Sequence, residues 1–272
     1  MNWGKIKTMF IYVFIVLNII LLSFFIYTVE KNSADIVQEK EIIEKSMAND
    51  NITVEENYTK KDNLGYVNVT ISDLKDIKQD VSGLNYDLTK SDKTAILKVT
   101  SEASLTNVNK NNYKVDLDTF LLERFKPSAN YIFSSYDSNK KEIIYDQQVD
   151  GLRIFSNNNA RIVFHVDDNG DVKSFEQTLV TNIRKDKNET LVTQSQAVNR
   201  LYHEDLIPKN SKVKANLGYY TYISQTENQV LIPTWNIVIS NNDSGEIKNY
   251  YVDAINLDIL NKKKRKKRKE RK

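Results

Sequence analysis

Cysteine is absent from the 272-residue sequence, and histidine occurs only twice. Without cysteine the chain has no disulfides, no thiolate metal sites and no cysteine nucleophile. His165 lies in an alternating, strand-like run and His203 stands beside two acidic residues, so we expect both to be ordinary surface side chains that hold no metal. Glycine and proline are few, at seven and three, whereas fifteen tyrosines and ten phenylalanines indicate well-formed secondary structure with aromatic packing.

The sequence also lacks the common catalytic patterns. It has no serine in a nucleophile elbow, no glycine-rich phosphate loop and no carboxylate pair that stands out from the acidic background. We therefore expect a protein that is not an enzyme and that carries no cofactor.

One acidic segment has the spacing of a calcium loop. VDDNGDV, residues 166–172, places Asp167, Asn169 and Asp171 at alternate positions, with Glu176 at the offset of the bidentate ligand. Strand-like runs flank this segment, whereas a calcium-binding helix–loop–helix needs helices. We therefore interpret it as a hairpin with a type I′ turn and predict no metal site.

Basic charge is concentrated at one end of the chain. The net charge is +3, but the last eleven residues, KKKRKKRKERK, alone carry +9, so residues 1–261 hold 29 basic and 35 acidic residues, a net charge of −6. A nucleic-acid-binding domain should have a basic face of its own, so this distribution argues against nucleic acid as a partner.

A long apolar run near the N-terminus predicts a membrane anchor. Residues 9–29 contain no charge, and as a helix they would extend over about 31 Å, enough to cross a hydrocarbon core. Lys5 and Lys7 precede the run, so we expect residues 1–8 to be cytoplasmic and the bulk of the chain to lie outside. Bulky residues follow the run where signal peptidase requires small ones, which favours an uncleaved, single-pass anchor in the cell membrane.

Asn18 lies near the middle of this apolar run and has two interpretations. It is either a tolerated polar residue or a residue that forms an interhelical hydrogen bond to another transmembrane helix, worth roughly 0.5–2 kcal/mol. The second interpretation makes Asn18 a contact for a membrane partner.

The polybasic tail, residues 262–272, also has two interpretations. In the predicted orientation it faces outward, where teichoic acids or anionic lipid head groups are the available polyanions, and each basic residue can contribute about 1 kcal/mol. The alternative is a disordered extension with no dedicated target. Removal of the tail should lower retention on such polyanions at low salt if the first interpretation holds. The residues concerned are Lys262, Lys263, Lys264, Arg265, Lys266, Lys267, Arg268, Lys269, Arg271 and Lys272.

Between anchor and tail, the pattern predicts a polar, helical stalk over 30–63 and a first domain over 64–185. In that domain the apolar spacing predicts an amphipathic helix at 115–125 ended by Pro127. Alternating runs then predict strands at 131–136, 142–146, 160–166 and 172–177.

A second domain is expected over 186–261. A helix at 190–207 with Thr193 or Thr190 as its cap precedes three strand-like runs, at 213–224, 230–240 and 249–260. The fold class is therefore α+β: a transmembrane helix followed by two tandem domains outside the membrane, each a helix plus an antiparallel sheet. The aromatic runs LGYYTY, TWNIVI and NYYVDA fit packing on half-buried sheet faces, with a ligand platform as the alternative.

Several stretches resemble one known family. MNWGKIKTMFIYVFIVLNIILL at the N-terminus, YDQQVDGLRIFSNNNARIVFHVDDNG, and LGYYTYIS, VLIPTWNIVI and NYYVDAINLDIL toward the C-terminus are similar to the YycI family of membrane-anchored regulators in low-GC Gram-positive bacteria. The resemblance covers the anchor and most of 110–260, whereas 30–105 match weakly and the polybasic tail departs from the family ending.

This resemblance implies a function and partners. Members of the family are non-catalytic regulators of an essential two-component sensor kinase, YycG or WalK, that controls cell-wall metabolism. They associate with the kinase and with a companion of similar architecture, YycH, through transmembrane and extracytoplasmic contacts. The C-terminal stretch is also similar to small domains of protease propeptides. The alternative is therefore a surface protein that binds the cell wall or inhibits a protease through its C-terminal domain and basic tail.

Overall fold

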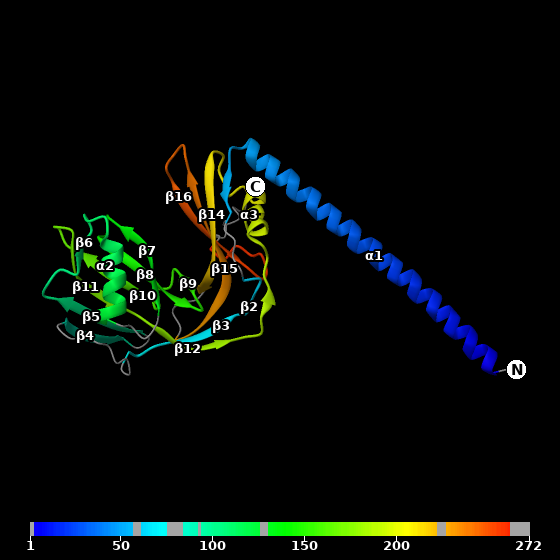
Figure 1. Ribbon diagram of the computed structural model, residues 1–272, viewed down its shortest axis with the longest axis horizontal. Helices are drawn as coiled ribbons and strands as arrows, with labels where there is room; N and C mark the ends of the chain where they lie inside the picture. The colour runs from blue at the N-terminus through cyan, green and yellow to red at the C-terminus, as the bar shows by residue number, and fades with distance from the viewer. Residues whose placement is uncertain are drawn as a thin grey trace, which may run out of the picture. The chain divides into compact units, whose positions relative to one another are not determined.

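The computed structural model describes residues 3–56, 61–74, 84–91, 94–125, 130–221 and 227–261 (Figure 1). The chain divides into two compact units. One consists of Met1–Thr53 with Pro208–Ser211, and the other of Val54–Ile207 with Lys212–Lys272.

The first unit contains a single long helix, α1 (Trp3–Asn49), of 47 residues. The apolar run and the predicted helical part of the stalk are thus one continuous helix. Asn51, at a φ of 56°, breaks the helical backbone just beyond its end. Two contacts with Pro208–Ser211 hold the C-terminal end of α1. The Lys209 ammonium lies 2.8 Å from the Asp50 carboxylate, and the Asn51 side-chain amide donates to Asn210 Oδ1 at 2.8 Å.

The second unit is built on one sheet of fourteen strands. The sheet has the order β12-β3-β15-β14-β9-β8-β10-β11-β5-β4, with β1 beside β14, β16 beside β15, β6 beside β11 and β7 beside β8. We call the half around β8 the first lobe; it contains β4 (Leu84–Ser91), β5 (Thr94–Ser101), β6 (Thr106–Asn107), β7 (Tyr131–Asp137), β8 (Glu142–Val149), β10 (Arg161–Val166) and β11 (Asp171–Gln177). The other half is the second lobe; it contains β1 (Thr53–Glu55), β3 (Val67–Ile71), β12 (Val180–Lys185), β14 (Ser211–Thr221), β15 (Asn228–Asn241) and β16 (Ile247–Asp253). A separate two-stranded sheet pairs β2 (Asn63–Leu64) with β13 (Glu189–Thr190).

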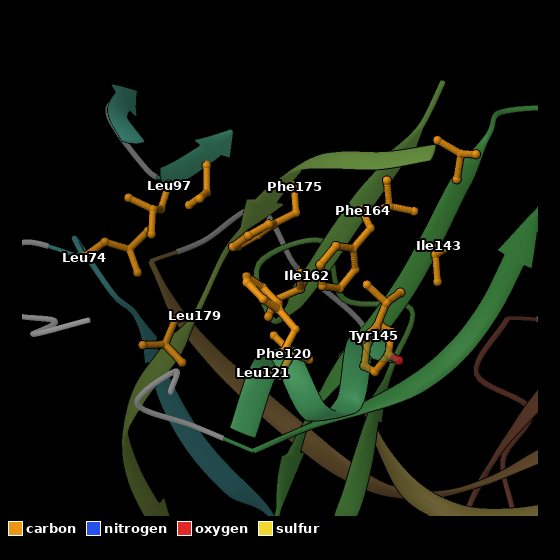
Figure 2. Packing of buried hydrophobic residues seen from close by; sticks show 14 of the residues in the cluster. Leu74, Leu97, Phe120, Leu121, Ile143, Tyr145, Ile162, Phe164, Phe175 and Leu179 are labelled. Atoms are coloured by element: carbon orange, nitrogen blue, oxygen red, sulfur yellow. The ribbon is translucent and has the colours of Figure 1, made fainter. Parts of the chain in front are cut away.

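One helical segment covers the first lobe. It begins as α2 (Tyr113–Thr119) and continues as a π-helix, η1 (Phe120–Phe125), so the predicted helix at 115–125 is confirmed, with its second half wound more loosely than expected. Its predicted apolar stripe is buried at Leu117, Phe120 and Leu121. The Phe120 ring packs edge-on against Phe175 and Phe164, at centroid distances of 5.7 and 6.4 Å (Figure 2). The predicted stop at Pro127 lies outside the described residues.

The hairpin of β10 and β11 matches the prediction in its strands but not in its turn. Gly170 has a φ of +84°, whereas Asn169 is not among the residues with positive φ, so the turn is not type I′. The Gly170 amide donates to the Asp167 carbonyl and the Asp167 amide to the Asp171 carbonyl, the pattern of a type I turn followed by a glycine bulge. The Asp167 carboxylate favours this turn because it accepts the amides of Asn169 and Asp171, both at 2.9 Å.

The second lobe has its own helix, α3 (Gln194–His203), shorter than the predicted 190–207. Of the two expected caps, Thr193 is the one used: its hydroxyl accepts the Gln196 amide and the Gln196 side chain accepts the Thr193 amide, a complete capping box. The Trp235 indole of β15 donates to the Val192 carbonyl at 2.9 Å and anchors the start of the helix to the sheet.

Two strands of the second lobe come from earlier in the chain. β3 pairs antiparallel with β15, and β12 pairs antiparallel with β3. Both strands lie inside the range 64–185. The proposed division at residue 185 therefore does not coincide with a break in strand pairing.

β9 (Leu152–Phe155) joins the two lobes. It forms a tight hairpin with β8 and pairs parallel with β14 through Ile154 and Phe155. Gly218 permits this approach, since a Cβ atom there would lie 2.4 Å from the Phe155 ring. Buried amides cross the same junction: Asn157 donates to Gln229 Oε1 at 2.7 Å and to Thr221 Oγ1 at 3.0 Å.

Candidate membrane anchor and interaction surfaces

The N-terminal part of α1 is exposed and strongly apolar. Lys7–Tyr27 has a mean hydropathy of 2.8, and none of its most apolar stretch is buried against protein. Phe10 and Phe24 are 71% and 67% exposed, whereas large apolar side chains in the lobes are largely buried. A continuous apolar cylinder of this length is unfavourable in water and matches the thickness of a bilayer, so this segment is a candidate membrane anchor.

Asn18 is only partly satisfied within the helix. Its side-chain amide donates one N–H to the Phe14 carbonyl at 2.7 Å. An amide offers two N–H donors and a carbonyl acceptor, so one donor and the acceptor stay available for another helix in the hydrocarbon region. The Ser23 hydroxyl in this span likewise donates to the Ile19 carbonyl, at 2.8 Å. The role of Asn18 as a partner contact stays a prediction.

The other residues considered for binding do not gather into a metal site. His203 is exposed and His165 is half-buried on β10. Within the described ranges, no group of three histidine, aspartate or glutamate side chains could hold a metal ion. The calcium-like segment instead uses Asp167 to close its own turn, and hydrogen bonding to the Asp171 amide is the main cause that lowers the pKa of the Asp167 carboxyl. The polybasic tail, 262–272, lies outside the described residues, and polyanion binding there stays a prediction.

The aromatic runs divide between the core and a half-open face. Trp235 and Tyr219 are buried, 4% and 1% exposed. On the opposite face of the sheet, Tyr220 stacks on Tyr251 at 4.4 Å, and Phe155 lies 6.0 Å from Tyr251. We call Phe155, Tyr220 and Tyr251 the junction aromatics, because they lie where β9 joins the second lobe. They pack on one another across β9, β14 and β16, which supports the expected packing role.

A buried charge lies close to the junction aromatics. The Asp146 side chain of β8 is 8% exposed, and its carboxylate lies 3.9 Å from Arg153 Nε. Burial raises the pKa of the Asp146 carboxyl, while a hydrogen bond from Ser134 and the charges of Arg153 and Arg161 oppose the rise. Arg153 also donates to the Phe133 carbonyl at 2.6 Å. Sequence reasoning missed this group, because only the β8–β9 hairpin brings Asp146 and Arg153 together.

A polar groove lies on the outer strands of the second lobe. It encloses about 430 Å³ and lies over β3, β12 and the beginning of β15. Its polar lining comprises Asn68, Thr70, Asn182, Arg184, Asp186, Asn228 and Gln229. A bulge in β12 between Thr181 and Arg184, with Asn182 at a φ of 51°, interrupts the regular pairing with β3. No local pattern in the sequence indicates this groove, since its residues are brought together only by the pairing of distant strands.

Two of the solved structures that match this chain are distant relatives in sequence. An uncharacterized protein from Eubacterium rectale ATCC 33656 is 10% identical over 77% of this chain and 90% of that one, with a TM-score of 0.44. The Bacillus megaterium YpeB C-terminal domain is 12% identical over 82% of this chain and 94% of that one, with a TM-score of 0.40. At such identities and TM-scores, neither structure assigns a ligand or a function to this chain.

No curated protein matches the sequence. The model of one protein family does match: the YycI protein, over residues 30–255. The matched range begins after the apolar part of α1 and includes both lobes of the sheet. Because it covers most of the sequence, the chain belongs to the YycI family.

Proposed function

We propose that this chain is a single-pass, membrane-anchored accessory regulator of a two-component sensor kinase that controls cell-wall metabolism. Its partners would be a WalK/YycG-type kinase and a YycH-like companion, contacted both in the membrane and outside it. The observation that carries the proposal is the family match over 30–255, together with the exposed apolar helix that precedes the matched range.

The charge pattern supports one orientation of the anchor. Lys5 and Lys7 lie before the apolar segment, and the positive-inside rule places such flanks in the cytoplasm. Both lobes would then lie outside the cell, where they could contact the outer domains of a kinase and a companion.

The continuity of α1 supports a mechanical role for the anchor. The helix runs from Trp3 to Asn49 without a break, so its apolar segment and the roughly 33 Å of helix that follow it form one element. A contact made outside could therefore shift or rotate the segment inside the membrane. Regulation requires that the chain bind two arrangements of the kinase helices with different affinity, since equal affinity shifts no population.

We further propose that the chain acts without catalysis. A regulator of this kind needs one binding surface within the membrane and another outside it, and it needs no reactive group. The scattered placement of the acidic side chains supports this, because Asp167 and Asp146 have structural partners in the turn and at the junction.

Capture from membranes tests the proposal. The full chain with a C-terminal tag should recover the kinase and the companion from mildly solubilised membranes. Asn18→Leu removes the open amide of the span, and we expect kinase recovery to weaken about two- to thirtyfold, the range expected for one interhelical hydrogen bond.

A matched control separates a specific contact from a general effect of polarity. Asn18→Leu combined with Ile20→Asn keeps one asparagine among aliphatic residues in the span but moves the amide about 200° around the helix. Recovery should stay low in this variant. Full recovery with Asn18→Leu, together with recovery after the whole span is replaced by an unrelated apolar helix, would place the contact in the outer lobes. Failure to recover either partner with the native chain would contradict the proposal and favour a wall-binding or protease-inhibiting surface protein.

A further inference from the structure

The polar groove of the second lobe has the construction of a ligand site. Its side chains come from the exposed faces of neighbouring strands in fixed register: Asn68 lies between Val230 and Arg184, and Thr70 lies between Asn228 and Thr181. Below these side chains, β3 is buried at Val67, Val69 and Ile71, so the floor of the groove is a rigid part of the core. At about 430 Å³ the groove is within the usual size range of small-molecule sites.

Some polar groups of the groove are occupied by one another. The Asn68 amide donates to the Asp186 carboxylate at 3.3 Å, and the Thr70 hydroxyl donates to Asn228 Oδ1 at 3.1 Å. These bonds hold four side chains in place. They leave acceptor capacity on Asp186, because a carboxylate accepts several hydrogen bonds.

Two groups stay open. Among the residues that the structure describes, neither the Arg184 guanidinium nor the Asn182 side-chain amide has a hydrogen-bond or ion-pair partner. Both residues belong to the bulged part of β12, and both line the groove. A neighbouring basic residue on the same strand differs, since Lys185 is paired with Asp150.

This set of groups defines the chemistry of a ligand. Amides both donate and accept hydrogen bonds, as hydroxyl groups do, and the Asp186 carboxylate requires donors. The Arg184 guanidinium favours a carboxylate or a phosphate. A bare anion would be repelled by Asp186, and an apolar ligand would leave the amides unpaired. A ligand with many hydroxyl groups and one anionic group satisfies both charges.

We propose that the groove over β3, β12 and β15 binds an anionic sugar, whose acidic group pairs with Arg184 while its hydroxyl groups bond to Asp186 and the asparagine side chains. This inference is independent of the proposed function, because it rests on the groove alone. A sugar carboxylate and a sugar phosphate share the required chemistry, and the probes below separate them.

Ligand-observed NMR with the full chain in detergent micelles tests the site. The probes are N-acetylmuramic acid, which carries a carboxylate, N-acetylglucosamine 1-phosphate, and neutral N-acetylglucosamine, each up to about 10 mM. We expect one or both acidic sugars to bind and the neutral sugar to bind at least about tenfold more weakly, because it lacks the charge-assisted bonds to Arg184. Arg184→Gln should weaken the acidic sugar to the level of the neutral one.

Lys185→Gln is the matched control, since it removes the same charge from the next residue of the strand but leaves Arg184 in place. It should leave binding unchanged. Equal loss in Arg184→Gln and Lys185→Gln would reduce the effect to overall charge and would overturn the assignment. The assignment would also be overturned if the neutral sugar bound as well as the acidic ones, or if no sugar bound. The peptide acetyl-alanyl-alanine carries a carboxylate but no sugar, and equally tight binding of this peptide would overturn the assignment too.

Discussion

Two aspartates of the first lobe lie in opposite electrostatic environments. Asp146 is buried beside Arg153, and its burial raises the pKa of the carboxyl. Asp167 is half-exposed in the β10–β11 turn, where hydrogen bonds from the Asp171 and Asn169 amides lower the pKa of the carboxyl. The structure therefore disfavours the charged form of one aspartate and favours that of the other.

These directions predict opposite pH dependences of stability. The folded chain keeps the Asp146 proton to a higher pH than the unfolded chain does, so the contribution of Asp146 to the free energy of unfolding falls as pH rises from about 4 through the raised pKa. Asp167 behaves in reverse: its contribution is present above the unfolded pKa and is lost as pH falls through the lowered pKa. We expect the stability difference between the native chain and Asp146→Asn to decrease with rising pH, and that for Asp167→Asn to increase.

Unfolding midpoints of the native chain and of both variants, measured between about pH 3 and pH 7, test both predicted pH trends. Each variant serves as the control of the other, because both replace one aspartate of the same lobe by asparagine. If the two stability differences changed with pH in the same direction, burial would not be the dominant effect on the pKa of Asp146, and the prediction would be wrong.

At the scale of the element, the α2–η1 segment shows how winding decides which side chains are buried. Leu121 belongs to the core cluster (Figure 2) and is 5% exposed. Its neighbour Leu122 is 74% exposed. Leu121→Ala should lower the free energy of unfolding by about 2–5 kcal/mol, because it removes buried contacts and leaves a cavity. Leu122→Ala should change it by less than about 0.5 kcal/mol.

Denaturant unfolding of the two alanine variants measures this difference under identical conditions. The pair is closely matched, since the residue type and the element are the same. Similar losses in both variants would mean that the π-helical winding does not orient the segment as described.

Elements of this kind could be predicted because their signal is local. The spacing of Leu117, Phe120 and Leu121 identified the buried helix face, and the alternation in 160–177 identified both strands of the hairpin. The turn of that hairpin was predicted wrongly, because Asn-Gly favours a type I′ turn whereas the Asp167 side chain favours the type I turn with a bulge. Periodicity gives the faces of an element but not the side-chain bonds that select a turn.

Non-local pairing was beyond the reach of the sequence. Nothing in the pattern of 67–71 indicated that this segment pairs with β15, about 160 positions later in the chain. Nor did the pattern of 180–185 indicate that it pairs with 67–71, more than a hundred positions earlier. The polar groove depends on such pairings, whereas Asp146 and Arg153 are brought together by the local β8–β9 hairpin. The apolar helix near the N-terminus could be predicted, because its signal is composition and length alone, whereas its orientation in a membrane stays a prediction.

At the scale of the whole molecule, the lobes share one sheet. β9 pairs with β8 of the first lobe and with β14 of the second. β3 covers the edge of β15 at 228–231, where Leu231 is fully buried and Gln229 is 2% exposed, and β12 in turn pairs with β3. Residues 186–261 alone would leave that edge and those side chains open to water, and the Gln229 side chain would lose its bond to Asn157.

This arrangement predicts how fragments of the chain fold. Residues 53–261, which contain every strand of the sheet, should unfold in one cooperative transition. Residues 186–261 should show no cooperative transition, because the hydrogen bonds of β15 to β3 and the burial of Leu231 are missing. Thermal unfolding followed by circular dichroism and by tryptophan fluorescence compares the two fragments, since Trp235 is present in both. A cooperative transition of 186–261 on its own would establish that the division at residue 185 separates two domains that fold independently, and that β3 and β12 only extend a sheet that is already stable.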